Sequence, residues 1–177
     1  NEACARDWST LEQDLVLCEK AGFDYIEIRL DMLTDYLKRH TVEELAAFFC
    51  TSRLKPHAFN ALYLYPEFLS EGDDEARQKE LLEEFRLGCE VGRAIGSHYF
   101  IIVPPLQRDP AGGPYTGSWE DTFSNCVRIL KELSRRAEPY DMNLCFELVG
   151  FERSSVRSIG QADAVVRAVD RPNVGFV

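Results

Sequence analysis

Apolar residues alternate along the chain between short runs typical of buried strands and longer stretches with helical spacing. The strand-like runs are expected at residues 25–28, 57–62, 99–103, 144–148 and 174–177. Their starts recur roughly every 30 to 45 residues, which is the length of a strand–helix unit. Strands separated by helices in this way favour a parallel sheet, so the pattern predicts an α/β fold.

The helical stretches carry recognisable start and stop signals. Ser9 and Glu12 have the spacing of a capping box, and the helix that they begin should end at Gly22. Thr41 and Glu44 repeat the arrangement at the start of a second helix. Apolar residues at helical spacing predict three more helices, over about residues 74–95, 118–137 and 160–169. No low-complexity linker divides the chain, so one domain over residues 1–177 is expected.

Two α/β architectures fit this order of elements, a doubly wound open sheet and part of a (β/α)8 barrel. Ile26 and Ile28 share one face of their strand, whereas Glu27 and Arg29 share the other. The run that leads to Glu147 alternates in the same way. Apolar positions toward the helices and polar positions toward an inner mouth are typical of a barrel. No GxGxxG or GxxxxGK[ST] motif follows a strand, which disfavours nucleotide binding.

A complete barrel of this kind needs about 250 residues, and the chain has 177. Asn1-Glu2-Ala3 resembles the tail of a strand, and the segment from Asn173 to Val177 stops within one. We therefore expect a partial barrel with about six of the eight strands. Its unpaired strand edges would favour association, and a homodimer is one way to cover them.

Composition narrows the classes of function. The formal net charge of −10 disfavours nucleic-acid binding. No apolar run reaches the roughly 18 residues of a membrane span, so no membrane partner is expected. The six cysteines are scattered without a CxxC pair, and several occupy apolar positions. They are interpreted as buried free thiols in a protein of the reducing cytoplasm.

Glu147 is the most informative single residue, because it ends an apolar strand in the stretch Cys145-Phe146-Glu147-Leu148. An ionised carboxylate that leaves water without a partner is costly. Glu147 should therefore bind a metal, take part in catalysis or pair with a nearby arginine. From the pattern alone, pairing with an arginine and a functional role are equally open.

Several short motifs, taken in order, resemble the xylose isomerase-like barrel superfamily. They are Asn1-Glu2-Ala3, Leu17-Cys18-Glu19-Lys20, the run from Asp24 to Arg29, Lys55-Pro56, Asn60-Ala61-Leu62, Ala137-Glu138-Pro139-Tyr140, Glu147 with Val149-Gly150, and Arg171 with Asn173-Val174-Gly175. The resemblance covers essentially the whole chain. Within the superfamily it is strongest to the 2-keto-myo-inositol (inosose) isomerases.

The resemblance implies one divalent metal, manganese, zinc or magnesium, held by a glutamate, an aspartate, a histidine and a second glutamate at the strand ends. Glu147 matches the first of these ligands, and the other three are expected beyond residue 177. The implied substrate is a small keto-polyol or sugar. Its isomerisation removes a proton next to a carbonyl, so that the metal stabilises the enediolate and a carboxylate carries the proton. Glu147 is thus expected to be both metal ligand and catalytic acid or base.

Five further residues are candidates for substrate binding. Glu27 and Arg29 would contact a polyol at the mouth, or form structural ion pairs. Asn60 would bind substrate hydroxyls, or cap its loop. Glu152 would line the mouth, or be a solvated loop residue. His57 would lie in the substrate pocket, or be a barrel histidine with its hydrogen bonds satisfied.

Other functions remain open at this stage. Pro56-His57-Ala58 has a faint similarity to a zinc-binding strand of endonuclease IV, but the other two histidines, His40 and His98, provide no companion ligand. Tyr63, Tyr65 and Phe68 would wall the pocket or pack over the barrel end. The same metal and base would also suit an inosose or dehydroshikimate dehydratase or a ketose 3-epimerase. An alternative of another class is a non-catalytic fragment that binds a polyol or a partner chain.

Overall fold

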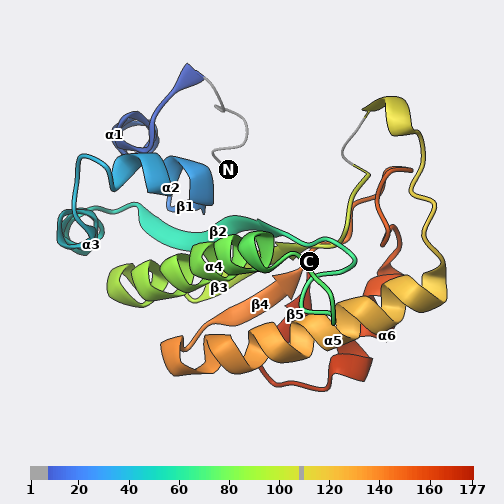
Figure 1. Cartoon of the computed structure of the whole chain (residues 1–177). Coiled ribbons are helices and arrows are strands. Elements are labelled where there is room, and N and C mark those ends of the chain that lie inside the picture. The colour runs from blue at the N-terminus through green and yellow to red at the C-terminus, as the bar shows by residue number, and fades with distance from the viewer. Residues whose placement is uncertain (1–7, 108–109) are drawn as a thin grey trace.

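The computed structural model describes residues 8–107 and 110–177, which form one parallel sheet covered by helices (Figure 1). The described strands are hydrogen-bonded in chain order, each parallel to the next. They are β1 (Tyr25–Arg29), β2 (Lys55–Tyr63), β3 (Tyr99–Val103), β4 (Asn143–Phe146) and β5 (Val174–Phe176). A doubly wound sheet reverses its strand order at a switch point. This uninterrupted order is instead that of successive barrel strands.

Helices connect the strands on one side of the sheet. They are α1 (Leu11–Ala21), α2 (Leu30–Tyr36), α3 (Val42–Thr51), α4 (Glu75–Ile95), α5 (Trp119–Ala137) and α6 (Ile159–Val169). Two short 3-10 turns, η3 (Pro110–Gly112) and η4 (Glu138–Tyr140), flank α5. Figure 1 shows α4 and α5 lying along the sheet, and each contacts strands directly. None of the described helices is long and apolar enough to cross a membrane.

The structure confirms the five strands expected at residues 25–177, with ends that differ by up to two residues. The strand expected at Asn1-Glu2-Ala3 lies outside the described residues. The capping box at Thr41 and Glu44 is also confirmed. The cap predicted for the first helix is wrong by one residue, because Thr10 and Gln13 form the reciprocal hydrogen bonds.

That shift has a physical reason. Ser9-x-x-Glu12 and Thr10-x-x-Gln13 have equivalent capping patterns. Starting the helix one residue later leaves Leu11 in the first turn, where it is 1% exposed. The hydroxyl of Ser9 has no hydrogen-bond partner among the described residues. α2 was not expected at all, since it follows β1 without a turn and its N-cap residue, Arg29, has no side-chain oxygen to cap the free backbone N–H groups of the first turn.

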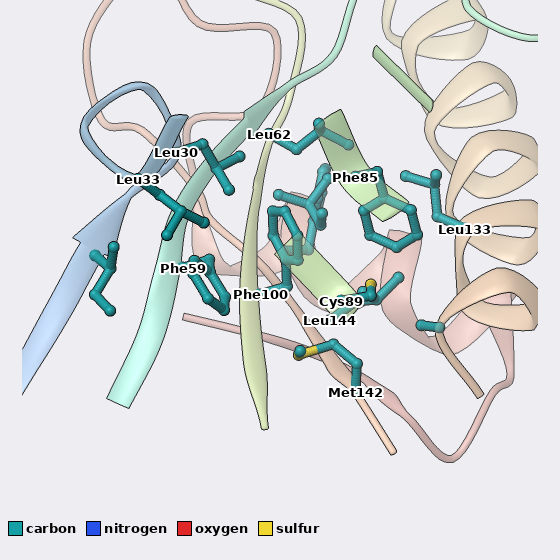
Figure 2. Close-up of a cluster of buried hydrophobic side chains, with 14 of the residues drawn as sticks. Leu30, Leu33, Phe59, Leu62, Phe85, Cys89, Phe100, Leu133, Met142 and Leu144 are labelled. Carbon is teal, nitrogen blue, oxygen red and sulfur yellow. The ribbon is translucent and has the colours of Figure 1, made fainter. Parts of the chain in front are cut away.

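The main core lies between the outer face of the sheet and the helices. Figure 2 shows its centre, where the ring of Phe100 lies between those of Phe59 and Phe85. Ring centroids are 5.8 Å apart for Phe59 and Phe100 and 5.1 Å apart for Phe85 and Phe100. Each fully buried large apolar side chain contributes about 1.5–3 kcal/mol to stability. This packing fixes the helices on the sheet and so determines which strand face remains for a site.

A second, smaller cluster lies on the opposite face of the sheet. It contains Ala58, Ala61, Ile101 and Val103, with Cys145 packed against it. These side chains are small or branched, as expected for the filled interior of a barrel. The alternation seen in the sequence at residues 26–29 is therefore confirmed, with Ile26 and Ile28 in the outer core.

The described cysteines are free thiols, as expected: Cys18, Cys50, Cys89, Cys126 and Cys145. Cys4 lies outside the described residues. The prediction of burial is confirmed for Cys89 and Cys126 but is wrong for Cys50, which is exposed. Cys50 belongs to the last turn of α3, whose buried residues are Leu45 and Phe49. Phe49 therefore faces the core, while Cys50, the next residue of the helix, faces solvent.

Candidate active site

Two carboxylates lie on the inner face of the sheet, Glu27 in β1 and Glu147 directly after β4. The backbone N–H of Glu147 donates to the carbonyl of Ile102 at 3.0 Å, so the ladder between β3 and β4 continues past the last strand residue. Side chains in a strand alternate between faces, which places Glu147 on the same face as Cys145. Both side chains are partly buried. Glu147 therefore points toward the barrel interior.

The electrostatics show that these groups share one environment. Burial raises the pKa of the Glu147 carboxyl, and the nearby negative charge of Glu27 raises that pKa further. Burial raises the pKa of the Cys145 thiol as well, again with a contribution from Glu27. Two like charges close together in a partly desolvated site favour either a shared proton or a bound cation.

Asn60 and Arg29 extend this polar face along β1 and β2, where they are paired in register. The side-chain amide of Asn60 donates to Glu27 Oε2 at 3.4 Å. Nε of Arg29 donates to Asp31 Oδ1 at 2.9 Å, and a second contact completes the ion pair. Arg29 is thus oriented by the first turn of α2, and Asn60 is positioned beside the carboxylate pair.

A pocket of about 610 Å³ opens at the carboxyl ends of β1 and β2. Its lining comes from β1, α2, β2, the loop after β2, and α4: Arg29, Leu30, Asp31, Asn60, Ala61, Tyr63, Tyr65, Arg77, Glu80, Leu81 and Glu84. The volume is in the range of small-molecule sites, and the location is where barrel enzymes bind ligands. Asn60 connects the two features, since it lines the pocket and touches Glu27.

The structure does not bring His57 to this site. His57 lies near the amino end of β2, where its ring is 5.7 Å from that of Tyr25 and 5.5 Å from that of Tyr99, between centroids. These three aromatic side chains form a row at the opposite end of the strands from Asn60 and Glu147. His57 is exposed at this end of β2, so its position does not support a place in the substrate pocket.

Glu152 is also separate from the carboxylate pair. Its side chain is exposed, and its backbone carbonyl accepts a hydrogen bond from the N–H of Tyr115 at 3.0 Å. This bond belongs to a set that holds the loop after β4 against the loop after β3, including Gln107 N–H to the Arg153 carbonyl at 2.8 Å. Figure 1 shows the two loops side by side. The arrangement favours a solvated loop position for Glu152.

Several residues that line the pocket were not predicted from the sequence. Of the two alternatives for the aromatic residues, Tyr63 and Tyr65 fit the pocket wall, while Phe68 is buried behind Tyr65 with ring centroids 5.3 Å apart. Arg77 and Glu84 come from α4, well past the strand that bears Asn60. Sequence pattern marks them only as polar positions of a helix. The one available signal was a cation, Arg77, in the first turn of that helix, where the helix dipole disfavours it.

Among the described residues, no group of three or more His, Cys, Asp or Glu side chains could hold a metal ion. Glu27 and Glu147 supply two carboxylates on one face, which is part of a ligand set for a divalent cation. The donor chemistry of Glu147 therefore fits the role of one ligand. Further ligands would have to come from outside the described residues.

Comparisons with known proteins agree with this fold. Residues 15–177 match the family model "Xylose isomerase-like TIM barrel". The chain is 38% identical to the inosose isomerase of Halalkalibacterium halodurans and 38% identical to that of Bacillus subtilis, and all of it is aligned in both. It spans 59% and 60% of the lengths of these two relatives.

Solved structures show the same fold. A crystal structure of IOLI protein with a bound zinc atom matches 99% of this chain and 60% of that chain, with a TM-score of 0.84 and 38% identity. A D-psicose 3-epimerase structure matches 96% of this chain and 57% of its own, with a TM-score of 0.69 but only 16% identity, and so supports the fold alone. The partial barrel inferred from the strand order thereby has an independent basis. The chain belongs to the xylose isomerase-like TIM barrel family.

Proposed function

We propose that the protein is a metal-dependent isomerase of a keto-polyol such as 2-keto-myo-inositol, and that it moves a proton between carbons next to a carbonyl. The observation that carries the proposal is the position of Glu147, partly buried on the inner face at the carboxyl end of β4. Its relatives named inosose isomerase support the substrate class. The zinc atom bound to the similar IOLI structure supports a divalent metal.

Glu147 would have two roles, as a ligand of the metal and as a carrier of the substrate proton. The metal, manganese, zinc or magnesium, would supply positive charge to stabilise the enediolate. Desolvation and the charge of Glu27 make the Glu147 carboxylate a stronger base than a solvated one. Such a base is better matched to proton abstraction near neutral pH.

Glu27 and Asn60 would orient the substrate beside Glu147. A carboxylate accepts hydrogen bonds from hydroxyl groups, and an amide both donates and accepts them. The contact between Asn60 and Glu27 holds the amide in place before substrate arrives. Preorganised polar groups lower the cost of fixing a flexible polyol in a reactive geometry.

The charges of the pocket favour a neutral substrate over a phosphate ester. Its lining contains Arg29 and Arg77 against Asp31, Glu80 and Glu84. Arg29 is already paired with Asp31. Phosphate recognition depends on an excess of charged donors, which this pocket does not offer. Binding of an uncharged keto-polyol does not require such an excess of charged donors.

The test is turnover of 2-keto-myo-inositol by the complete gene product that carries this chain, with manganese, zinc or magnesium supplied. Product identification by NMR separates an isomer from an epimer and from a dehydration product with enedione-type absorbance. Conversion to an isomeric inosose, lost on chelation and lost in Glu147→Gln, supports the proposal. Absence of turnover with every metal, or a dehydrated product alone, contradicts it.

A further inference from the structure

In the loop that joins β2 to α4, the carboxylate of Asp73 accepts three hydrogen bonds through one oxygen. Its Oδ2 accepts hydrogen bonds from the Tyr65 hydroxyl at 3.0 Å, the Leu69 N–H at 3.0 Å and the Gln78 side-chain amide at 3.1 Å. Burial alone would raise the pKa of Asp73, but these hydrogen bonds outweigh it and lower the pKa. Asp73 therefore ties both ends of the loop to the start of α4 as a carboxylate.

Tyr65 is the side chain that Asp73 holds against the pocket. It is 6% exposed, and its ring packs on that of Phe68. Burial, with the hydrogen bond to Asp73, raises the pKa of the Tyr65 hydroxyl to about 12. The hydroxyl thus remains protonated and keeps donating to Asp73 at physiological pH. The ring is a fixed platform in the pocket wall.

Arg77 rests on this platform, with its guanidinium carbon 3.6 Å from the centroid of the Tyr65 ring. A guanidinium stacked on an aromatic ring keeps its N–H groups at the edge, free to donate in the plane. Among the described residues, Arg77 donates no side-chain hydrogen bond and forms no ion pair, although it lines the pocket. An exposed arginine of a helix would ordinarily be mobile, but this one is oriented.

The position of Arg77 does not serve helix stability. It is the third residue of α4, which begins at Glu75 with Asp74 as its N-cap. A cation in the first turn is opposed by the helix dipole, and an acidic residue is the favoured choice there. A cost in helix stability at an exposed position, combined with a fixed orientation into a pocket, points to a role in binding.

We propose that Arg77 determines substrate specificity by donating hydrogen bonds to hydroxyl groups of the keto-polyol on the side remote from Glu147. The inference rests on the proposed function and adds the residue that recognises the non-reacting part of the substrate. Glu147 is not in the pocket lining, whereas Asn60 joins the lining to the carboxylate pair. A polyol that spans this connection would have its reacting carbons near Glu147 and its distal hydroxyls at Arg77.

The experiment compares Arg77→Met with Arg86→Met in the complete gene product. Arg86 is a matched control, because it lies on the same helix but does not line this pocket. Its guanidinium instead pairs with Glu90 at 2.7 Å. Loss of a hydrogen bond from a charged donor should raise KM for 2-keto-myo-inositol by roughly 10-fold or more. The kcat should change little, since the contact is equal in ground and transition states. Arg77→Lys keeps the charge but not the planar guanidinium group, so its KM should lie between those of the wild type and Arg77→Met.

Each outcome is decisive. A raised KM in Arg77→Met with unchanged kinetics in Arg86→Met supports the assignment, and an unchanged KM in Arg77→Met overturns it. If the wild type converts no keto-polyol, the proposed function fails separately. The proposed contact of Arg77 is then tested by calorimetric binding of myo-inositol. Weaker binding by Arg77→Met than by the wild type supports the contact. Equal binding by the two proteins, or no binding by the wild type, overturns it.

Discussion

A methyl group added at Gly88 tests the packing that places α4, and with it Arg77, on the sheet. A Cβ atom at Gly88 would lie 2.5 Å from Cε2 and 3.0 Å from Cζ of Phe100, and 3.2 Å from Cδ2 of Leu30. Favourable contacts between carbon atoms are at about 3.5–4.0 Å. Phe100 is fully buried between Phe59 and Phe85, so its ring has no room to retreat (Figure 2).

Two opposing terms set the size of the effect. Overpacking a core typically costs about 1–3 kcal/mol, and a clash with a rigid ring belongs in the upper half of that range. Alanine in place of glycine inside a helix contributes about 1 kcal/mol in favour of folding. We therefore expect Gly88→Ala to lower the free energy of unfolding by about 1–2 kcal/mol.

The assay is urea unfolding of the complete gene product, followed by circular dichroism. Gly160→Ala is the matched control, because Gly160 lies in α6 with no atom within 4 Å of the added Cβ. That variant should be as stable as wild type or slightly more stable. If Gly88→Ala behaves like Gly160→Ala, the close contact between α4 and β3 is not as the structure shows.

Three further predictions address chemistry and protonation. Glu147→Gln should lower kcat/KM for the keto-polyol by roughly 10²- to 10⁴-fold, whereas the kcat/KM of Glu152→Gln should stay near that of the wild type. Equal losses of kcat/KM in the two variants, measured in steady-state assays, would contradict the assignment of Glu147 to the active site. Asp73 has a folded-state pKa below its ordinary value of 3.8. Its stabilisation is therefore present at neutral pH and lost as the pH falls below about 4 toward the folded-state pKa. The gap in unfolding free energy between wild type and Asp73→Asn should accordingly shrink on acidification, and a gap independent of pH would count against the hydrogen-bonded carboxylate. Finally, a thiol reagent should label exposed Cys50 in the native protein but spare Cys89, whose pKa burial raises to about 12; mass spectrometry that finds Cys89 modified first would refute its burial.

Much of the fold follows from local pattern. Alternation at residues 26–29 identifies the strand faces, because burying Ile26 and Ile28 against helices necessarily turns Glu27 and Arg29 inward. The same argument places Glu147 on the inner face. The order of strands along the chain then puts β1 and β4 in one sheet, which brings Glu27 near Glu147 without any specific sequence signal for the pair.

Other features depend on tertiary contacts that pattern does not contain. α2 is short and follows β1 at once, so neither a cap nor a turn announces it. His57 shares a strand with Asn60, yet lies near the opposite end of that strand from the pocket. Arg77 is oriented by Tyr65 and Asp73, whose hydrogen bond depends on how the loop folds back. Residue type and spacing alone cannot reveal such a contact.

The most direct test of the central claim is to locate the metal in crystals of the complete gene product grown with zinc or manganese. The account predicts an anomalous difference peak about 2.0–2.2 Å from a carboxylate oxygen of Glu147, on the inner face of the sheet and beside Glu27. A metal bound elsewhere, with the Glu147 carboxylate engaged only by protein groups, would contradict it.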